Sequence, residues 1–188
     1  ASHWLISRWR AQHLSGDLTE VGCGIGGDSV FLSQSTNLTC FEKEPARTLL
    51  ARSNIEQLGQ GALVECREVD LRDITGEVLF CDPARRASGR IHNPDDWQPS
   101  LSEVASCFTS GRFTRVLIKT APGIKDEALS ELPSPETTFI SVDGQLKEAQ
   151  VHLGGVAQEK AAVLLTTGSE LPLTYKTKYN SIPIEQPA

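Results

Sequence analysis

Hydrophobic and polar positions along the chain form short apolar runs that alternate with segments of helical spacing. Runs typical of strands lie at residues 17–21, 38–42, 63–69, 78–81, 115–119 and 139–142. The intervening spacing predicts helices at residues 2–14, 28–33, 44–58, 101–109 and 126–132, with Ser2 capping the first. Strands that alternate with helices indicate a parallel sheet that is covered on both faces.

The segment that follows Glu44 is the clearest helix. Pro45 stands where a missing N–H has no consequence, and Gly59 ends the segment. Between them, apolar side chains recur at helical spacing and form a stripe of Leu49, Leu50, Ile55 and Leu58.

The pattern changes after residue 142. Asp143–Gly144 is a turn pair that favours a hairpin, and strand-like runs at 146–153 and 161–166 follow without helices. We therefore predict one α/β domain over residues 1–174, with a doubly wound, mostly parallel seven-stranded sheet and a C-terminal antiparallel hairpin. Residues 175–188 show no core-forming period and are expected to be a tail or a linker to a further module of a larger parent protein.

The amino-acid composition limits which partners the chain is expected to bind, among nucleic acids, metal ions and membranes. The 188 residues carry 18 basic and 24 acidic side chains, a net charge of −6, so nucleic-acid binding would need a local basic patch. Five cysteines without a CxxC pair predict neither a metal site nor redox chemistry and suit a reducing cytoplasm. The chain has no run of eighteen apolar residues, so no membrane contact is expected.

A glycine-rich turn follows the first predicted strand, at Glu20-Val-Gly22-Cys23-Gly24-Ile-Gly26-Gly27. Glycines at such a place let a ligand lie directly on backbone, and the spacing also fits the dinucleotide pattern GxGxxG. A carboxylate at Glu20 pointing at the turn would repel a pyrophosphate but suits an ammonium or sulfonium group, and Gly26 leaves room for a bulky moiety. A nicotinamide dehydrogenase is therefore the weaker alternative.

Two further acids are predicted at the ends of the next two strands. Glu42 can accept two hydrogen bonds from a ribose diol, and Asp70 is placed to receive an adenine amino group. Each alone is also compatible with a solvated carboxylate. Together with Glu20 beside a glycine turn, they favour a nucleoside site.

These motifs resemble those of the class I S-adenosylmethionine-dependent methyltransferases, over residues 17–167. Residues 20–26 are similar to the first motif of that family, Phe41-Glu-Lys-Glu44 to its ribose-binding strand end, and Val69-Asp-Leu71 to its adenine-side motif. The resemblance implies S-adenosyl-L-methionine as cofactor, with Gly22 and Gly24 at the methionine part, Glu42 on the ribose and Asp70 on the adenine. The other motif positions expected in the cofactor site are Glu20, Cys23, Gly26, Lys43 and Leu71.

The fourth strand runs into Asp82-Pro83, at the sheet edge where ligands of open α/β sheets bind. This start resembles the motif of methyltransferases that act on exocyclic amines of bases, in which the acid and a following carbonyl hold the amine. Ala84 and Arg85 stand where those enzymes have proline and an aromatic residue. Asp82 and Pro83 are thus the predicted catalytic pair, and the alternative is that Asp82 caps a turn.

The stretch D-P-A-R-R-x-x-x-G-R resembles more closely a bacterial branch of methyltransferases with a THUMP-like domain, and distantly the RNA cap guanine methyltransferases. Arg85, Arg86 and Arg90 form a positive cluster suited to phosphate, extended by Lys119 and Lys125, although salt bridges to Asp95 and Asp96 are an equal alternative. Trp97 either stacks on a base or anchors the loop.

These features favour methyl transfer to a nitrogen of an RNA base. Transfer to a small anionic metabolite is the alternative within the same class. A non-catalytic cofactor-binding module of an RNA-processing protein is the alternative outside it.

Overall fold

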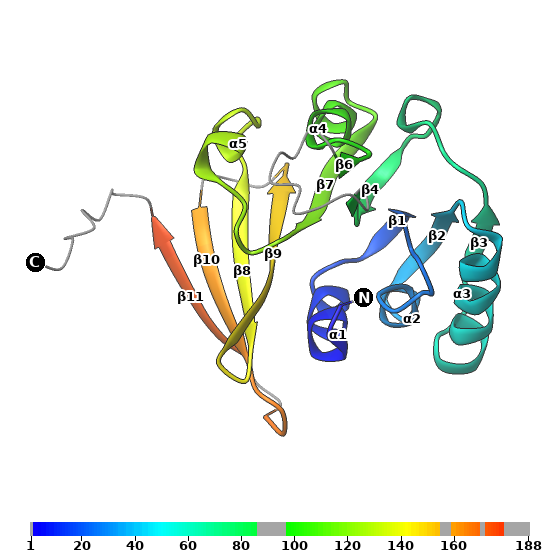
Figure 1. The fold of residues 1–188 in the computed structure, drawn as a ribbon, viewed down its shortest axis with the longest axis horizontal. Coiled ribbons are helices and arrows are strands. Elements are labelled where there is room, and N and C mark those ends of the chain that lie inside the picture. The colour runs from blue at the N-terminus through cyan, green and yellow to red at the C-terminus, as the bar shows by residue number, and fades with distance from the viewer. Residues whose placement is uncertain (1, 86–96, 155–158, 170–171, 179–188) are drawn as a thin grey trace, which may run out of the picture.

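A computed structural model describes residues 2–85, 97–154, 159–169 and 172–178 of the chain. Its centre is a nine-stranded sheet with the order β11-β10-β8-β9-β7-β4-β1-β2-β3 (Figure 1). The strands of this sheet are β1 (Gly16–Val21), β2 (Thr36–Glu42), β3 (Leu63–Cys66), β4 (Gly76–Cys81), β7 (Phe113–Thr120), β8 (Glu136–Val142), β9 (Gln145–Leu153), β10 (Glu159–Leu165) and β11 (Leu173–Lys178).

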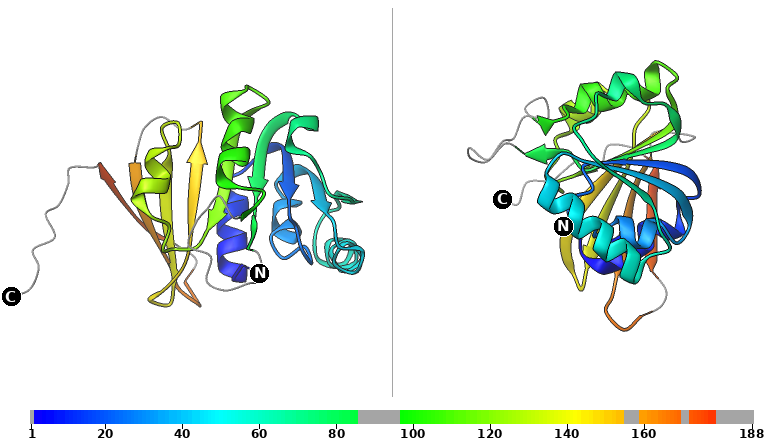
Figure 2. Two further views of the ribbon diagram at one scale, coloured as in Figure 1. Left: turned by 45° about the horizontal axis from the view of Figure 1, so that its top comes forward. Right: turned by 90° about the vertical axis from the view of Figure 1, so that its right-hand side faces the viewer.

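Helices cover both faces of the sheet. Figure 2 shows α1 and α3 on one face and α4 on the other. The helical segments are α1 (Trp4–Gln12), α2 (Ser29–Leu32), α3 (Pro45–Leu58), a 3-10 turn (Leu71–Asp73), α4 (Leu101–Thr109) and α5 (Asp126–Ser130). A separate two-stranded sheet pairs β5 (Ala84–Arg85) with β6 (Trp97–Gln98).

Alternate side chains of the central strands pack in two different hydrophobic cores, one on each face of the sheet. On β4, Leu79 and Cys81 pack in the cluster beneath α4, whereas Val78 and Phe80 pack in the cluster that includes α2 and α3. Successive side chains of a strand point to opposite faces, so a strand that is buried on both sides reads as a continuous apolar run. This explains why the central strands carry no alternating pattern.

The predicted doubly wound sheet is confirmed. β1 pairs in parallel with β2 and β4, and β4 pairs in parallel with β7. β9 runs antiparallel between β7 and β8. The turn between β8 and β9 uses Asp143 and Gly144, both with positive φ, as the hairpin prediction requires.

The sheet has nine strands where seven were predicted; β10 matches the predicted run at 161–166, whereas no run predicted β11. β10 pairs in parallel with β8, and β11 pairs antiparallel with β10. β11 runs from Leu173 to Lys178 and so continues past residue 174, the predicted end of the domain. The rest of the predicted tail, 179–188, lies outside the described residues.

Three local predictions are also wrong. His3, and not Ser2, caps α1, since its side chain accepts a hydrogen bond from the Leu5 N–H. The predicted stripe of α3 is largely solvent-exposed, because the small side chains of Thr48 and Ala51, together with Ile55, allow the helix to approach the sheet. β3 ends at Cys66 instead of Val69.

Within the part of the chain that is described, no helix combines the length and the apolar character that crossing a membrane requires.

Candidate functional site

The glycine turn joins β1 to α2 and packs directly against the end of β4. Gly22 has a φ of 82°, and a Cβ at this position would lie 2.8 Å from the carbonyl oxygen of Asp82. The N–H of Asp82 in turn donates to the carbonyl of Val21 at 3.2 Å. A residue with a side chain would clash with this backbone, so Gly22 brings the turn and Asp82 together.

Gly24 is the open position of the turn. Its φ is 58°, and a Cβ there would meet no atom within 4 Å. Its N–H donates to Oε2 of Glu42 at 2.9 Å, and Oε1 of Glu42 accepts from the N–H of Glu44 at 2.9 Å. The structure therefore places Glu42 beside the turn, as predicted, with free space over Gly24 for a ligand.

Glu20 does not point at the turn, which corrects the sequence interpretation. It lies on the same face of β1 as Leu18 and is 1% exposed, and its Oε2 accepts from Ser29 Oγ at 2.6 Å and from the Cys40 thiol at 3.5 Å. Burial, followed by the nearby Asp28 carboxylate, raises the pKa of Glu20 to about 7. Strand alternation thus directs this acid into the core under α2, away from any ligand on the turn.

Asp70 lies four residues beyond β3 and not at the strand end. It caps the 3-10 turn and binds the Arg72 side chain, with Oδ2 2.5 Å from Nη2. These hydrogen bonds with Arg72 lower the pKa of Asp70 to about 2. Its partly exposed carboxylate remains accessible, whereas Leu71 is buried in the core with Val21 and Phe41, so Leu71 offers no side chain to a ligand.

Three further motif residues, Cys23, Gly26 and Lys43, were predicted in the cofactor site. Cys23 is buried among the core residues under the turn. A Cβ on Gly26 would lie 3.1 Å from the Cα of Ala51, so Gly26 permits close packing of α3 and does not make room for a bulky moiety. Lys43 is about half exposed and lies 3.6 Å from Glu68.

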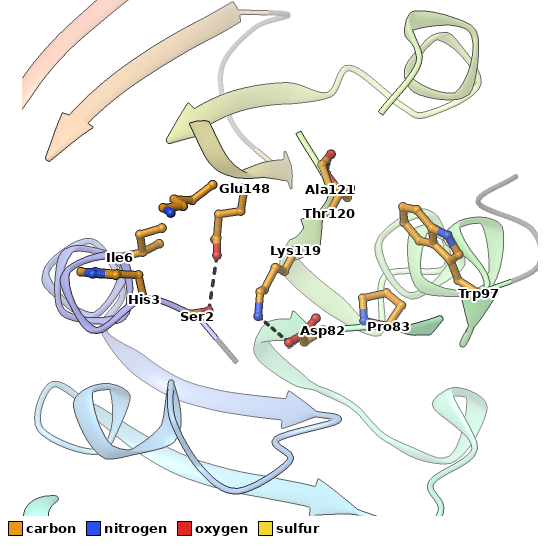
Figure 3. Close-up of a pocket in the computed structure, with 11 residues that line it drawn as sticks. Ser2, His3, Ile6, Asp82, Pro83, Trp97, Lys119, Thr120, Ala121 and Glu148 are labelled. Atoms are coloured by element: carbon orange, nitrogen blue, oxygen red, sulfur yellow. Dashed lines mark hydrogen bonds and ion pairs between the residues drawn. The ribbon is translucent and has the colours of Figure 1, made fainter. Parts of the chain in front are cut away.

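A cavity of about 580 Å³ lies at the ends of β4 and β7 and includes Asp82, which contacts the turn at Gly22. Its lining comes from α1 and the segment before it, from the ends of β4 and β7, and from β6 and β9 (Figure 3). Cavities of this volume commonly hold small-molecule ligands. The lining residues are Ser2, His3, Ile6, Asp82, Pro83, Trp97, Lys119, Thr120, Ala121, Lys147 and Glu148.

Asp82 and Lys119 form an ion pair in this cavity. Lys119 Nζ lies 2.5 Å from Oδ2 of Asp82 and 3.8 Å from Oδ2 of Asp28. The side chain of Asp82 is 36% exposed. Lys119 was predicted to extend an arginine patch, whereas the structure assigns it to Asp82; Lys125 lies apart, at the start of α5. Asp82 lines the cavity at the sheet edge where a ligand was predicted to bind.

Sequence reasoning missed the buried charges behind this pair. Arg10 of α1 is ion-paired with Asp28 and Glu148, and its guanidinium lies 4.6 Å from the centre of the Phe80 ring. Burial opposes the charged form of Asp28, yet Arg10 and Lys119 hold its pKa below the usual value. An arginine on an amphipathic helix is ordinarily solvated, so no sequence signal marked Arg10; Asp28 directly after the glycine turn was the available clue.

The predicted arginine cluster is described only in part. The backbone of Arg85 pairs with that of Trp97 in the small β5–β6 sheet. Arg86 and Arg90 lie outside the described residues. Trp97 is buried, packs in the core cluster under α4 and also lines the cavity, so it both anchors the loop and borders the site. Among the described residues, no group of three or more His, Cys, Asp or Glu side chains could hold a metal ion.

Comparisons with known proteins relate the chain to methyltransferases. No family model matches the sequence. The chain is 30% identical over 174 residues to an uncharacterised S-adenosylmethionine-dependent methyltransferase from two strains of Mycobacterium tuberculosis. This alignment includes 88% of the chain but 48% of each relative, so the chain spans about half the length of the curated relatives it matches.

Solved structures share the fold. A protein of Porphyromonas gingivalis W83, provisionally assigned as a methyltransferase, superposes with a TM-score of 0.73 and 21% identity over 93% of this chain and 48% of its own. The Pyrococcus abyssi tRNA (uracil-54, C5)-methyltransferase, bound to S-adenosyl-L-homocysteine, superposes with a TM-score of 0.54 and 13% identity. The match covers 79% of this chain and 37% of that protein. Magnesium protoporphyrin IX methyltransferase from Synechocystis PCC 6803 superposes with a TM-score of 0.53 and 14% identity, over 79% of this chain and 73% of that protein. The chain therefore has the Rossmann-like fold of the class I S-adenosylmethionine-dependent methyltransferases.

Proposed function

We propose that the chain is the catalytic domain of an S-adenosylmethionine-dependent methyltransferase that modifies a nitrogen of an RNA base. The observation that carries this proposal is the contact between Gly22 and Asp82. It sets a turn with open space over Gly24 directly beside a cavity that holds an exposed carboxylate. Methyl transfer needs such adjacency, because donor and acceptor must meet in line at about 3 Å.

The residues present fit the cofactor. The open backbone at Gly24 would bear the methionine part, Glu42 has lone pairs left for the ribose hydroxyls, and Asp70 is exposed for the adenine side. Glu20, Cys23 and Leu71 would support the site from the core. When bound, S-adenosylmethionine would supply an electrophilic methyl group on its sulfonium.

The protein's part in the reaction is to place the acceptor. Oδ2 of Asp82 is engaged by Lys119, and within the described residues no hydrogen bond reaches Oδ1. Oδ1 can therefore accept one hydrogen of an amine, while the carbonyl of Pro83 accepts the other and the nitrogen lone pair is directed at the methyl group. A proton released after transfer would leave along the hydrogen bond to Asp82.

The charge of the cavity favours a base over a small anion. Its wall carries the carboxylates of Asp82 and the buried Glu148, and Lys119 is already paired with Asp82 and Asp28. An anion placed there would face two carboxylates without a free cation from these residues. Lys147 is exposed at the rim, where it suits a phosphate of the nucleotide backbone.

Mass spectrometry of nucleosides from total RNA, with and without the gene for the parent protein, tests this function. One N-methylated nucleoside should disappear in the deletion strain and return on complementation with the wild type but not with Asp82→Asn. An unchanged nucleoside profile would contradict the RNA assignment. Full complementation by Asp82→Asn would contradict the role of Asp82.

A further inference from the structure

Glu148 presents a second carboxylate to the cavity that the proposed reaction leaves unused. It lies on β9, is 4% exposed and lines the cavity together with Asp82 (Figure 3). Its Oε1 accepts from Arg10 and, at 3.0 Å, from Gln150 Nε2. Oε1 is therefore fully engaged, and Oε2 is the atom available to the cavity.

Oε2 of Glu148 lacks a committed donor among the described residues. Ser2 Oγ lies 3.3 Å away, but the same hydroxyl lies 2.8 Å from Oδ2 of Asp28. A serine hydroxyl has one hydrogen, which the shorter contact takes. Because Oε2 shares this donor with Asp28, a ligand N–H placed near it in the cavity would be favoured.

The electrostatic balance of this cluster points the same way. Two cations, Arg10 and Lys119, face three carboxylates, namely Asp28, Glu148 and Asp82. One negative charge is left uncompensated within this set. A hydrogen-bond donor brought into the cavity is stabilised there, whereas a carbonyl oxygen is repelled.

We infer that Glu148 is a specificity-determining residue which, together with Asp82, selects bases bearing an amino group over those bearing an oxo group in its place. This inference rests on the proposed function and deepens it. An amino group directs its two hydrogens at Asp82 and the Pro83 carbonyl, and the nearby negative charge of Glu148 stabilises them, whereas a carbonyl would turn lone pairs toward both carboxylates. A site built to receive hydrogen-bond donors rejects a ligand that lacks them, because its buried acceptors then stay unpaired.

Matched nucleotide pairs test the inference without methyl transfer. With S-adenosyl-L-homocysteine present, calorimetry would compare cytidine with uridine monophosphate and adenosine with inosine monophosphate. At least one amino member should bind about 10- to 100-fold more tightly than its oxo partner, the worth of one hydrogen bond to a charged group. Glu148→Gln should lower that ratio, with Asp82 retaining the remainder, while Glu127→Gln, at an exposed position of α5, should leave it unchanged.

Glu148→Asp keeps the charge beside Arg10 while withdrawing the carboxylate from the cavity, and it should give an intermediate ratio even if Glu148→Gln folds poorly. Equal binding within both pairs, an unchanged ratio in Glu148→Gln and Glu148→Asp, or no nucleotide binding by a chain that binds S-adenosyl-L-homocysteine would each overturn the inference. Absence of S-adenosyl-L-homocysteine binding would instead overturn the proposed function.

Discussion

The ammonium nitrogen of Lys119 lies 2.5 Å from Oδ2 of Asp82, so the acceptor end of the cavity is an ion pair between β7 and β4. Lys119→Met should lower single-turnover methyl transfer about 10- to 100-fold, because Asp82 loses the hydrogen bond that fixes its orientation. Lys119→Arg should restore most of the rate, since it keeps a charged donor. Affinity for S-adenosyl-L-homocysteine should stay within about threefold in both variants, because the pair lies on the acceptor side.

Lys125→Met is the matched control, because Lys125 is an exposed residue at the start of α5. A Lys119→Met enzyme as fast as the control would show that Asp82 needs no partner.

The two positive-φ glycines of the turn should respond differently to alanine. Gly22→Ala places a Cβ against the Asp82 carbonyl at 2.8 Å, so both folding stability and activity should fall, with about 1–3 kcal/mol lost from the free energy of unfolding. Gly24→Ala meets open space and should lose about 1 kcal/mol, yet its methyl group occupies the proposed ligand site.

Urea denaturation and titration with S-adenosyl-L-homocysteine separate these effects. Gly24→Ala should be the variant whose affinity falls far more than its stability. Unimpaired binding by Gly24→Ala would place the ligand elsewhere.

Arg10 should contribute strongly to stability because it holds two buried carboxylates. Arg10→Met removes the partner of Asp28 and Glu148 together, and breaking a buried pair in this way costs about 3–5 kcal/mol. Arg8→Met, at an exposed position on the same helix, should change the free energy of unfolding by less than about 0.5 kcal/mol. If urea denaturation finds the two variants equal, the buried pairs do not stabilise the fold.

The buried Glu20 should make stability depend on pH. Its pKa is about 7 in the folded chain and ordinarily near 4.5, so between these values the folded state binds more protons than the unfolded state. Its contribution to stability is therefore full below about pH 4.5, is lost as the pH rises to about 7, and amounts to about 3 kcal/mol. Glu20→Gln should become more stable relative to the wild type as the pH rises from 5 to 8.

His152 acts in the opposite direction, because burial lowers its pKa to about 4. Its contribution to stability grows from about pH 4 to 6.5, where the unfolded chain binds the extra proton. The difference between Glu20→Gln and the wild type removes this shared effect. A difference that stays constant with pH would mean that Glu20 titrates like an exposed acid.

The fold could be predicted from the chain because its strands are buried on both faces and its turns carry strong local signals. Asp143–Gly144 placed the hairpin, and Pro45 and Gly59 bounded α3 correctly. β11 was not predicted, because its sequence has no core-forming apolar period, although it pairs with β10, its neighbour along the chain. The leucine stripe of α3 was wrongly predicted to be buried, because the close fit of Ala51 against Gly26 decides which face of the helix meets the sheet.

Some residues of the candidate site lie in local sequence motifs, whereas others are brought together only by the fold. Gly22, Gly24, Glu42 and Asp82 lie in local motifs, and the structure brings them together at the turn and the end of β4. Glu20 was misassigned because the side of β1 that faces α2 depends on strand alternation. Arg10, Lys119 and Glu148 come from three separate elements, so their ion pairs exist only in the assembled fold.

Calorimetric titration with S-adenosyl-L-homocysteine, alongside NAD, tests the central claim most directly. The chain should bind one equivalent of S-adenosyl-L-homocysteine and no NAD. Glu42→Gln should weaken that binding about 10- to 100-fold, because a charged acceptor for the ribose is lost, whereas Glu44→Gln at the neighbouring exposed position should not. Binding of NAD in place of S-adenosyl-L-homocysteine, or equal affinities in the wild type and Glu42→Gln, would contradict the account.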